Sequence, residues 1–257
     1  MNISLKILFC ILKISILCSL VSCTGKDNNT YTEIPFSYTT AGDIVIKGNV
    51  NGEEENFILY TSFDDVLLHA PSTEHDEGYY YLVNGLYLND KFIPVEVVIM
   101  NTVLDGIPYG YGLLGIKAFS GYWMEMSFTE NKIKLYKSKP DNYIEKLPAK
   151  TELDQTPGID FGISVSVEIN QEEIFMPITT YPEFSFRFPY YCEDFLQDVN
   201  IVKVFDETLR IKRDTIELAP VGGIGLEYLK NFNILFDLTN YNSGKTTYFY
   251  YERGNDL

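Results

Sequence analysis

The chain of 257 residues contains an internal repeat. Residues 112–126 match residues 222–236 in the order of their glycines and apolar positions. Each segment has a glycine-centred step, at Gly115 in the first and at Gly225 in the second. In both segments we expect one short helical turn and then an alternating strand. A repeat of this length limits the chain to architectures built from two equivalent parts.

A second pair of segments repeats in the same order. Residues 44–62 resemble residues 163–181, with Asn51-Gly52 aligned on Asn170-Gln171. Asn-Gly between two alternating runs is typical of a two-residue hairpin turn. The sequence therefore predicts two lobes of like topology, each with a hairpin followed later by a glycine-centred segment.

Strand signals dominate both halves. Aromatic residues make up 15% of the chain, with 20 Tyr and 17 Phe, and such residues favour strands over helices. Further hairpins are predicted at Asn84-Gly85 and at Asn89-Asp90. Because no segment has a long helical period, we expect an all-β fold.

The first residues are typical of an export signal. An apolar run broken only by Lys13 ends in Leu20-Val21-Ser22-Cys23, which predicts a signal peptide over residues 1–22. The last four of these residues resemble the lipobox of bacterial lipoproteins. This resemblance implies that Cys23 is acylated and that the protein is anchored to a membrane of the cell envelope, with the outer membrane expected. The face of that membrane stays open.

Charge and cysteine content exclude several classes of partner. The net charge of −16 repels phosphate backbones, so we do not expect nucleic-acid binding. Cys10 and Cys18 leave with the signal peptide and Cys23 carries lipid, which leaves only Cys192 and no intramolecular disulfide. We expect a monomer.

The composition along the chain predicts the domain boundaries. A polar stretch without periodicity has the character of a tether, and a charged segment with Pro140 and Pro148 has the character of a linker. The predicted parts are a tether over residues 23–33, a first lobe over 34–137, a linker over 138–150 and a second lobe over 151–257.

With these segments in place, the chain resembles the aspartic proteases, and in particular bacterial two-lobed relatives of the retroviral and pepsin-like enzymes. In that family a hairpin in each lobe leads to a strand and an apolar-Asp-Thr-Gly loop, and an apolar-apolar-Gly segment passes beside the loop. Here residues 57–62 and 113–115 fit the first lobe, and residues 176–181 and 223–225 fit the second. The resemblance covers residues 34–251. It implies a pepsin-like barrel fold of two similar lobes with a central cleft.

The chain departs from the family at the catalytic motif. The positions that match the two Asp-Thr-Gly triplets are Tyr60, Thr61, Ser62, Thr179, Thr180 and Tyr181. The family's chemistry needs two carboxyl groups that share one proton. A phenol and an aliphatic hydroxyl do not take these roles at ordinary pH. We therefore expect no peptidase activity and no catalytic residue.

Carboxylates near the two loops form the alternative. Asp64 and Asp65 follow the first loop and Glu183 follows the second. On alternating strand positions, Asp64 and Asp65 point to opposite faces. An active peptidase would have to use one of these displaced groups.

Clusters of aromatic residues raise the question of ligands. The resemblance implies a hairpin flap over the cleft, and Tyr79, Tyr80 and Tyr81 begin the segment placed to form it. Rings on such a surface stack on peptides or sugars. For Phe184, Phe186 and Phe188, filling the core of the second lobe is the favoured interpretation.

Other motifs are too weak to assign a cofactor or a metal. The Gly-x-Gly-x-x-Gly pattern of residues 110–115 lacks the long helix that seats a pyrophosphate. His69 and His75 have neither the spacing nor the partners of a zinc site. We expect no cofactor and no metal.

Together these patterns favour a catalytically inactive, aspartic-protease-like lipoprotein that binds a peptide or another ligand at the cell envelope. Two alternatives remain open. One is an active aspartyl peptidase with displaced carboxylates, and the other is a structural or carbohydrate-binding surface lipoprotein.

Overall fold

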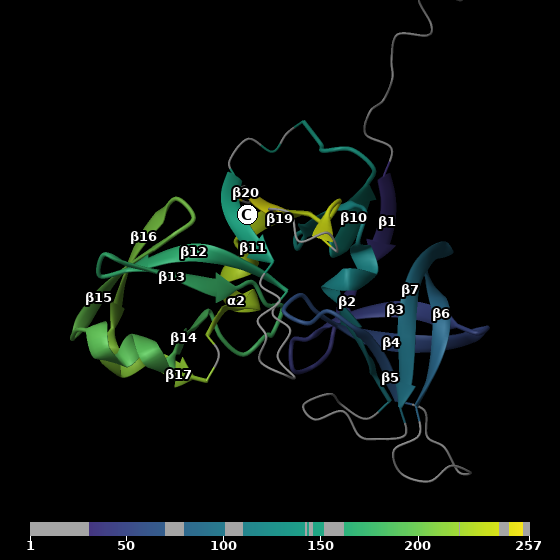
Figure 1. The fold of residues 1–257 in the computed structure, drawn as a ribbon, viewed down its shortest axis with the longest axis horizontal. Helices are drawn as coiled ribbons and strands as arrows, with labels where there is room; N and C mark the ends of the chain where they lie inside the picture. Colours follow the sequence, from purple (N-terminus) through teal and green to yellow (C-terminus); the bar gives the residue numbers. More distant parts are fainter. Residues whose placement is uncertain are drawn as a thin grey trace, which may run out of the picture. The chain divides into compact units, whose positions relative to one another are not determined.

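The computed structural model describes residues 31–69, 80–100, 110–141, 143, 146–151, 162–220, 222–241 and 247–253. These residues fold almost entirely into strands, so the predicted all-β class is confirmed (Figure 1). None of the helices within them has the length and apolar character needed to cross a membrane. Residues 1–30, including Cys23, lie outside the described residues.

The first half of the chain starts with a short strand and continues through hairpins. Its elements are β1 (Tyr31–Pro35), β2 (Ser37–Tyr38), β3 (Ile44–Val50), β4 (Glu53–Tyr60), β5 (Val66–His69), β6 (Tyr80–Leu88), β7 (Lys91–Met100), β8 (Gly112–Gly115), η1 (Ile116–Phe119), β9 (Trp123–Ser127) and β10 (Lys132–Tyr136). Asn51 and Gly52 have φ values of 54° and 93°, as a two-residue turn between β3 and β4 requires. The turn predicted there is confirmed.

The second half repeats this order with small additions. Its elements are β11 (Lys146–Thr151), β12 (Ile163–Ile169), β13 (Glu172–Pro177), β14 (Phe186–Pro189), η2 (Tyr190–Phe195), β15 (Val199–Val204), β16 (Glu207–Lys212), η3 (Arg213–Thr215), β17 (Glu217–Ala219), β18 (Gly223–Ile224), α2 (Leu226–Leu229), β19 (Phe232–Asp237) and β20 (Thr247–Arg253). Asn170 and Gln171 form the turn between β12 and β13 with positive φ values of 52° and 77°.

A seven-stranded sheet forms the body of the first half. Its order is β2-β3-β4-β8-β5-β7-β6, and a further pairing of β3 with β6 closes the strands into a barrel. β8 lies between β4, to which it is parallel, and β5, to which it is antiparallel. The glycine-centred segment is therefore inserted between two strands that come earlier in the chain.

The second half reproduces these pairings. β12 pairs with β13 and with β15, as β3 pairs with β4 and with β6. β14 pairs antiparallel with β18, as β5 does with β8. A parallel bridge between Ile178 and Ile224 corresponds to the parallel pairing of β4 with β8. The two similar halves predicted from the internal repeat are present.

One sheet runs through both halves. Its ten strands have the order β1-β10-β9-β19-β20-β11-β12-β15-β16, with β13 paired to β12. β9 and β19 meet antiparallel, with Met126 beside Ile234 and Met124 beside Phe236. These four side chains are buried, so the seam between the halves has one apolar face.

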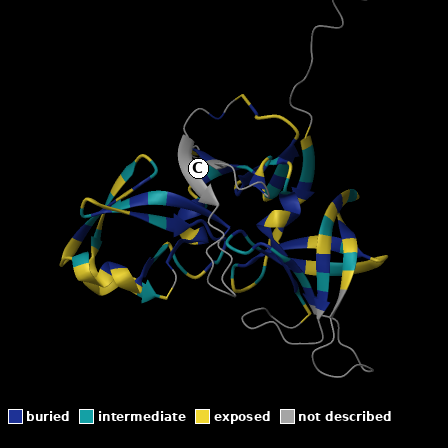
Figure 2. Ribbon diagram, viewed as in Figure 1, coloured by how far each residue is buried: buried dark blue, intermediate teal, exposed yellow. Residues whose placement is uncertain are grey.

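The core follows the alternation of the strands, as the buried positions in Figure 2 show. Of the three alternating phenylalanines, Phe188 is buried and Phe186 is partly buried against the core. Phe184 is of intermediate exposure. Cys192 is fully buried and is a free thiol.

Three expectations differ from the structure. The hairpin predicted at Asn84-Gly85 is wrong, because this dipeptide forms a bulge inside β6, whose partner β7 continues past it. Residues 146–150 of the expected linker belong to β11, which pairs with β12 and β20. Residues 31–33 of the expected tether belong to β1.

Candidate functional site

Two loops, one after β4 and one after β13, carry the six motif positions. The parallel pairing of β4 with β8 places Tyr60 opposite Gly115. The bridge between Ile178 and Ile224 places the second loop beside Gly225 in the same way. Each loop therefore leaves its strand next to a glycine-centred segment.

The central threonines of the two loops bind each other's strands. Thr61 Oγ1 donates a hydrogen bond of 2.8 Å to the carbonyl of Ile178. Thr180 Oγ1 donates to the carbonyl of Leu59, and it accepts a hydrogen bond of 3.3 Å from the backbone N–H of Thr61. Both threonines are fully buried. This paired arrangement, called here the threonine interlock, fixes the two loops against each other.

The residues beside the interlock also meet. Ser62 Oγ donates to Thr179 Oγ1 over 2.9 Å. Thr179 Oγ1 also accepts a hydrogen bond of 3.3 Å from the backbone N–H of Tyr181. Thr179, which we predicted to match the second aspartate of the family, therefore has a hydroxyl whose hydrogen-bond partners among the described residues lie within the two loops.

Tyr60, which we predicted to match the first aspartate of the family, has as its partner a carboxylate that the sequence analysis did not single out. Its hydroxyl donates to Asp43 Oδ1 over 3.5 Å, while Thr39 Oγ1 donates to Asp43 Oδ2 over 3.0 Å. Asp43 is only 6% exposed. Burial, and next the Asp43 carboxylate, raise the pKa of the Tyr60 phenol above its usual range. The phenol therefore stays protonated at neutral pH.

A row of aromatic rings starts at the same place. The ring centroids of Tyr60 and Tyr181 are 5.8 Å apart, and those of Tyr181 and Phe184 are also 5.8 Å apart. The Arg187 guanidinium lies 4.4 Å from the Phe184 ring centroid. Tyr181 Oη donates to Glu183 over 3.3 Å. The rings of Tyr60, Tyr181 and Phe184 thus form one contact surface beside the interlock, called here the aromatic row.

The three carboxylates considered as substitutes have other partners. Asp64 is 8% exposed and accepts a hydrogen bond from the Tyr241 hydroxyl. Asp65 lies 3.7 Å from the Lys117 ammonium in an ion pair at the surface. Glu183 is exposed and accepts from Tyr181. None of these bonds joins two carboxyl groups across the interlock.

Close packing explains the glycines of the two repeated segments. A Cβ atom at Gly115 would lie 2.4 Å from the backbone of Asp64 and Asp65. A Cβ atom at Gly225 would lie 2.1 Å from the Phe184 carbonyl oxygen. In each half the loop backbone therefore rests directly on the glycine.

Of the remaining predicted residues, two lie in β6 and two fall outside the residues that the structure describes. Tyr80 and Tyr81 begin β6, which pairs with β7, whereas Tyr79 and Cys23 fall outside the described residues. The flap and the lipid anchor stay predictions. Within the ranges that the structure describes, no group of three or more His, Cys, Asp or Glu could hold a metal ion.

Comparison with known proteins gives a likeness in structure alone. No protein-family model matches the chain, and no curated protein matches its sequence. The fold is similar to that in the crystal structure of aspartic proteinase from Irpex lacteus, with a TM-score of 0.51 and 8% identity. The likeness covers 86% of this chain and 97% of the other chain. The predicted pepsin-like fold is therefore confirmed, and at this identity the likeness carries no activity.

Proposed function

We propose that this chain is a pepsin-like protein that does not cleave peptides and instead binds a peptide or another ligand at the cell envelope. The observation that carries the proposal is the threonine interlock. Thr61 and Thr180 bond to each other's loops by equivalent contacts, which supports aligning both with the central residue of an Asp-Thr-Gly triplet. That alignment leaves Tyr60 and Thr179 where the fold's peptidases need aspartates.

The chemistry of these two side chains supports the loss of hydrolysis. Peptide hydrolysis by this fold needs one group that takes a proton from water and one that gives a proton to the scissile carbonyl. The Tyr60 phenol has a raised pKa, so it stays protonated at neutral pH and does not take a proton from water. Thr179 is a hydroxyl already bonded to Ser62. Neither side chain supplies a carboxylate.

The aromatic row supports a role in binding. Tyr181 and Phe184 are only partly buried and lie beside the loops, and flat rings at such a place provide contact area for an extended chain. The lipid anchor on Cys23 is part of the same proposal, and its support is the lipobox-like segment of the sequence.

A cleavage assay tests the loss of activity. The full chain, kept in detergent, is incubated with unfolded casein from pH 3 to pH 8, with and without a pepstatin-type inhibitor, and fragments are counted by mass spectrometry. Pepsin at equal concentration is the positive control. We expect no fragments beyond those of the protein-free sample. Cleavage that the inhibitor blocks would overturn the proposal.

The second candidate, a peptidase with displaced carboxylates, is favoured by the buried Asp43 beside Tyr60. If cleavage appears, the variants Asp43→Asn, Asp64→Asn and Glu183→Gln identify the group. Loss of cleavage in one of them, with the others unchanged, would establish this candidate in place of the first.

A binding assay tests the role of the aromatic row. Fluorescently labelled casein peptides are titrated with the full chain, and polarisation is measured. Tyr181→Ala should weaken binding, while Tyr190→Ala, which removes a ring that is 57% exposed on η2, serves as the matched control. Equal affinity of the two variants would contradict a role for the row.

Anchoring is tested separately by growing expressing cells with a radiolabelled fatty acid. We expect the label on the wild-type chain and no label on Cys23→Ala. Label that persists in the variant would exclude this cysteine as the anchor.

A further inference from the structure

A pocket of about 470 Å³ opens on the first half of the chain, away from the two motif loops. Its walls come from three places in the sequence: the junction of β1 and β2, the strands β3 and β4, and the turn between β6 and β7. None of the residues that line it belongs to the threonine interlock or to the aromatic row. The volume lies in the usual range for pockets that bind small molecules.

The pocket occupies a gap in the barrel. One edge of β3 pairs with β2 at Ile44 and Val45 and with β6 at Gly48 and Asn49. Among the described strands, the stretch of β3 between these pairings has a partner only on the β4 side. The ring of strands therefore opens at Lys47, which lines the pocket.

The mouth of the pocket is held by a side-chain contact. Asn89, in the turn between β6 and β7, donates a hydrogen bond of 2.8 Å from Nδ2 to the Glu33 carbonyl of β1. This bond ties the lining turn between β6 and β7 to β1, 56 residues away in the chain and two residues before the lining residue Pro35. It restrains one side of the pocket before a ligand arrives, which lowers the entropic cost of binding.

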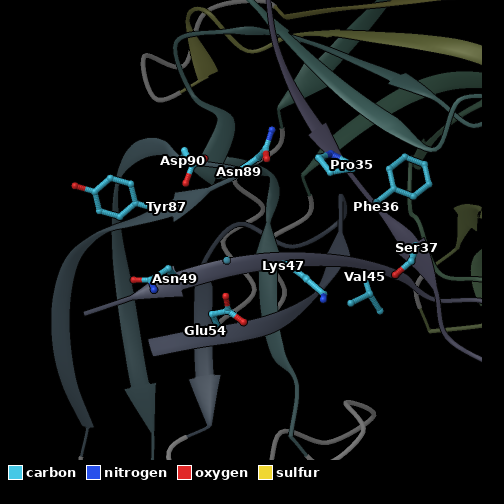
Figure 3. Close-up of a pocket in the computed structure, with 11 residues that line it drawn as sticks. Pro35, Phe36, Ser37, Val45, Lys47, Asn49, Glu54, Tyr87, Asn89 and Asp90 are labelled. Carbon is cyan, nitrogen blue, oxygen red and sulfur yellow. The ribbon is translucent and has the colours of Figure 1, made fainter. Parts of the chain in front are cut away.

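The lining combines one exposed ring with several polar groups. Tyr87 is 49% exposed, and its ring packs on Phe92 with centroids 5.3 Å apart. Figure 3 shows Tyr87 and Asp90 on one wall, with Lys47 and Glu54 on the wall opposite. No ion pair is present for Lys47, Glu54 or Asp90 within the described residues, so these charged groups are available to a ligand.

We propose that this pocket binds a neutral sugar. A pyranose ring has an apolar C–H face, which packs on an aromatic ring such as Tyr87. Its hydroxyls donate to carboxylates such as Glu54 and Asp90 and accept from an ammonium such as Lys47. The two carboxylates disfavour anionic ligands, and the charged groups of the lining disfavour wholly apolar ones. A neutral pyranose therefore fits both the Tyr87 side chain and the charged groups of the lining.

The test uses saturation-transfer NMR on the full chain. The chain is kept in a detergent without a sugar headgroup, because a glycoside detergent would compete for the site. The probes are maltose and N,N′-diacetylchitobiose as neutral disaccharides, and a heparin disaccharide as the anionic one. We expect transfer to at least one neutral probe and binding at least about tenfold weaker for the anionic probe.

Variants assign the signal to the pocket. Tyr87→Ala should weaken binding of the neutral probe by about tenfold or more, since it removes the stacking surface. Glu54→Gln reports on hydrogen bonding by the carboxylate, and Tyr190→Ala is a matched control in which an exposed ring outside the pocket is removed.

Three outcomes would overturn the proposal: no transfer to either neutral probe, equal binding by Tyr87→Ala and wild type, or stronger binding of the anionic probe. The casein assays of the proposed function use other residues. Failure here would therefore leave that proposal standing.

Discussion

Thr61 and Thr180 are bonded by equivalent contacts: each hydroxyl donates to the backbone carbonyl two positions before the other threonine. One contact ends on Ile178 and the other on Leu59, so each loop closes on the strand that leads into its counterpart. Because both threonines are buried, no water molecule takes the place of either hydroxyl when a substitution removes it.

Replacing either threonine with valine should destabilise the whole fold. Valine keeps the shape but leaves a buried carbonyl without its donor, which costs about 1–3 kcal/mol in the free energy of unfolding. Urea unfolding of Thr61→Val, Thr180→Val and the double variant measures this cost. The exposed Thr208→Val in β16 is the control and should change stability by less than about 0.5 kcal/mol.

Serine at the same positions separates the hydroxyl from the methyl group. Thr61→Ser keeps the donor, so it should lose less stability than Thr61→Val. If the valine variants unfold at the same urea concentration as the wild type, the interlock does not hold the loops together.

Gly225→Ala should be among the most destabilising single substitutions in the chain. The new Cβ would lie 2.1 Å from the Phe184 carbonyl oxygen, and the two segments cannot separate without losing the hydrogen bond from the Gly225 N–H to the Ser185 carbonyl. We expect a loss of more than about 3 kcal/mol, read from thermal unfolding by circular dichroism. Gly52→Ala is the comparison, because nothing lies within 4 Å of its Cβ and only its φ of +93° is unfavourable. A smaller loss at Gly225 than at Gly52 would contradict the close approach.

Cys192 should be unreactive in the folded protein. It is fully buried, and burial raises the pKa of its thiol to about 11, so the reactive thiolate is scarce at neutral pH. At pH 8, a thiol reagent should label it only after denaturation. Rapid labelling of the native chain would show that the thiol is accessible.

The same thiol predicts a dependence of stability on pH. The folded state favours the protonated form, so this contribution is present below the ordinary thiol pKa of about 9 and is lost as the pH rises toward 11. Between pH 8 and pH 11, the wild type should lose more unfolding free energy than Cys192→Ala. Parallel curves for the two proteins would contradict the prediction.

Tyr60 should remain a phenol in alkaline solution. Its pKa is raised by burial and then by Asp43. Up to about pH 11, the absorbance change from phenolate should be the same for the wild type and for Tyr60→Phe, although an exposed tyrosine has a pKa near 10. A smaller change in the variant would mean that Tyr60 ionises with the exposed tyrosines.

Local turn chemistry made part of the fold predictable. Asn51-Gly52 forms the predicted hairpin turn, because β3 and β4, the strands that it joins, pair with each other. The same kind of dipeptide at Asn84-Gly85 forms a bulge, because β7 pairs with β6 both before and after it. Whether a strand continues past such a dipeptide is set by its partner strand and not by the residues of the dipeptide.

Part of the candidate site could also be predicted from the sequence. The two loops follow from the internal repeat. Asp43 could have been found by counting from Asn51-Gly52, because Val45 faces Ile58 and the register continues toward Tyr60. The sugar pocket could not have been predicted, because it depends on Asn89 reaching the backbone of Glu33.

The antiparallel seam between β9 and β19 has a consequence for how the protein can be divided. Expressing either half alone would leave β9 or β19 with unpaired backbone groups at one edge of the strand, and would expose the buried side chains that the two strands share. Unpaired strand edges of this kind pair with strands of other chains and lead to aggregation. The two halves, although built alike, therefore depend on each other within one polypeptide, and a cut near residue 140 should yield two fragments that aggregate.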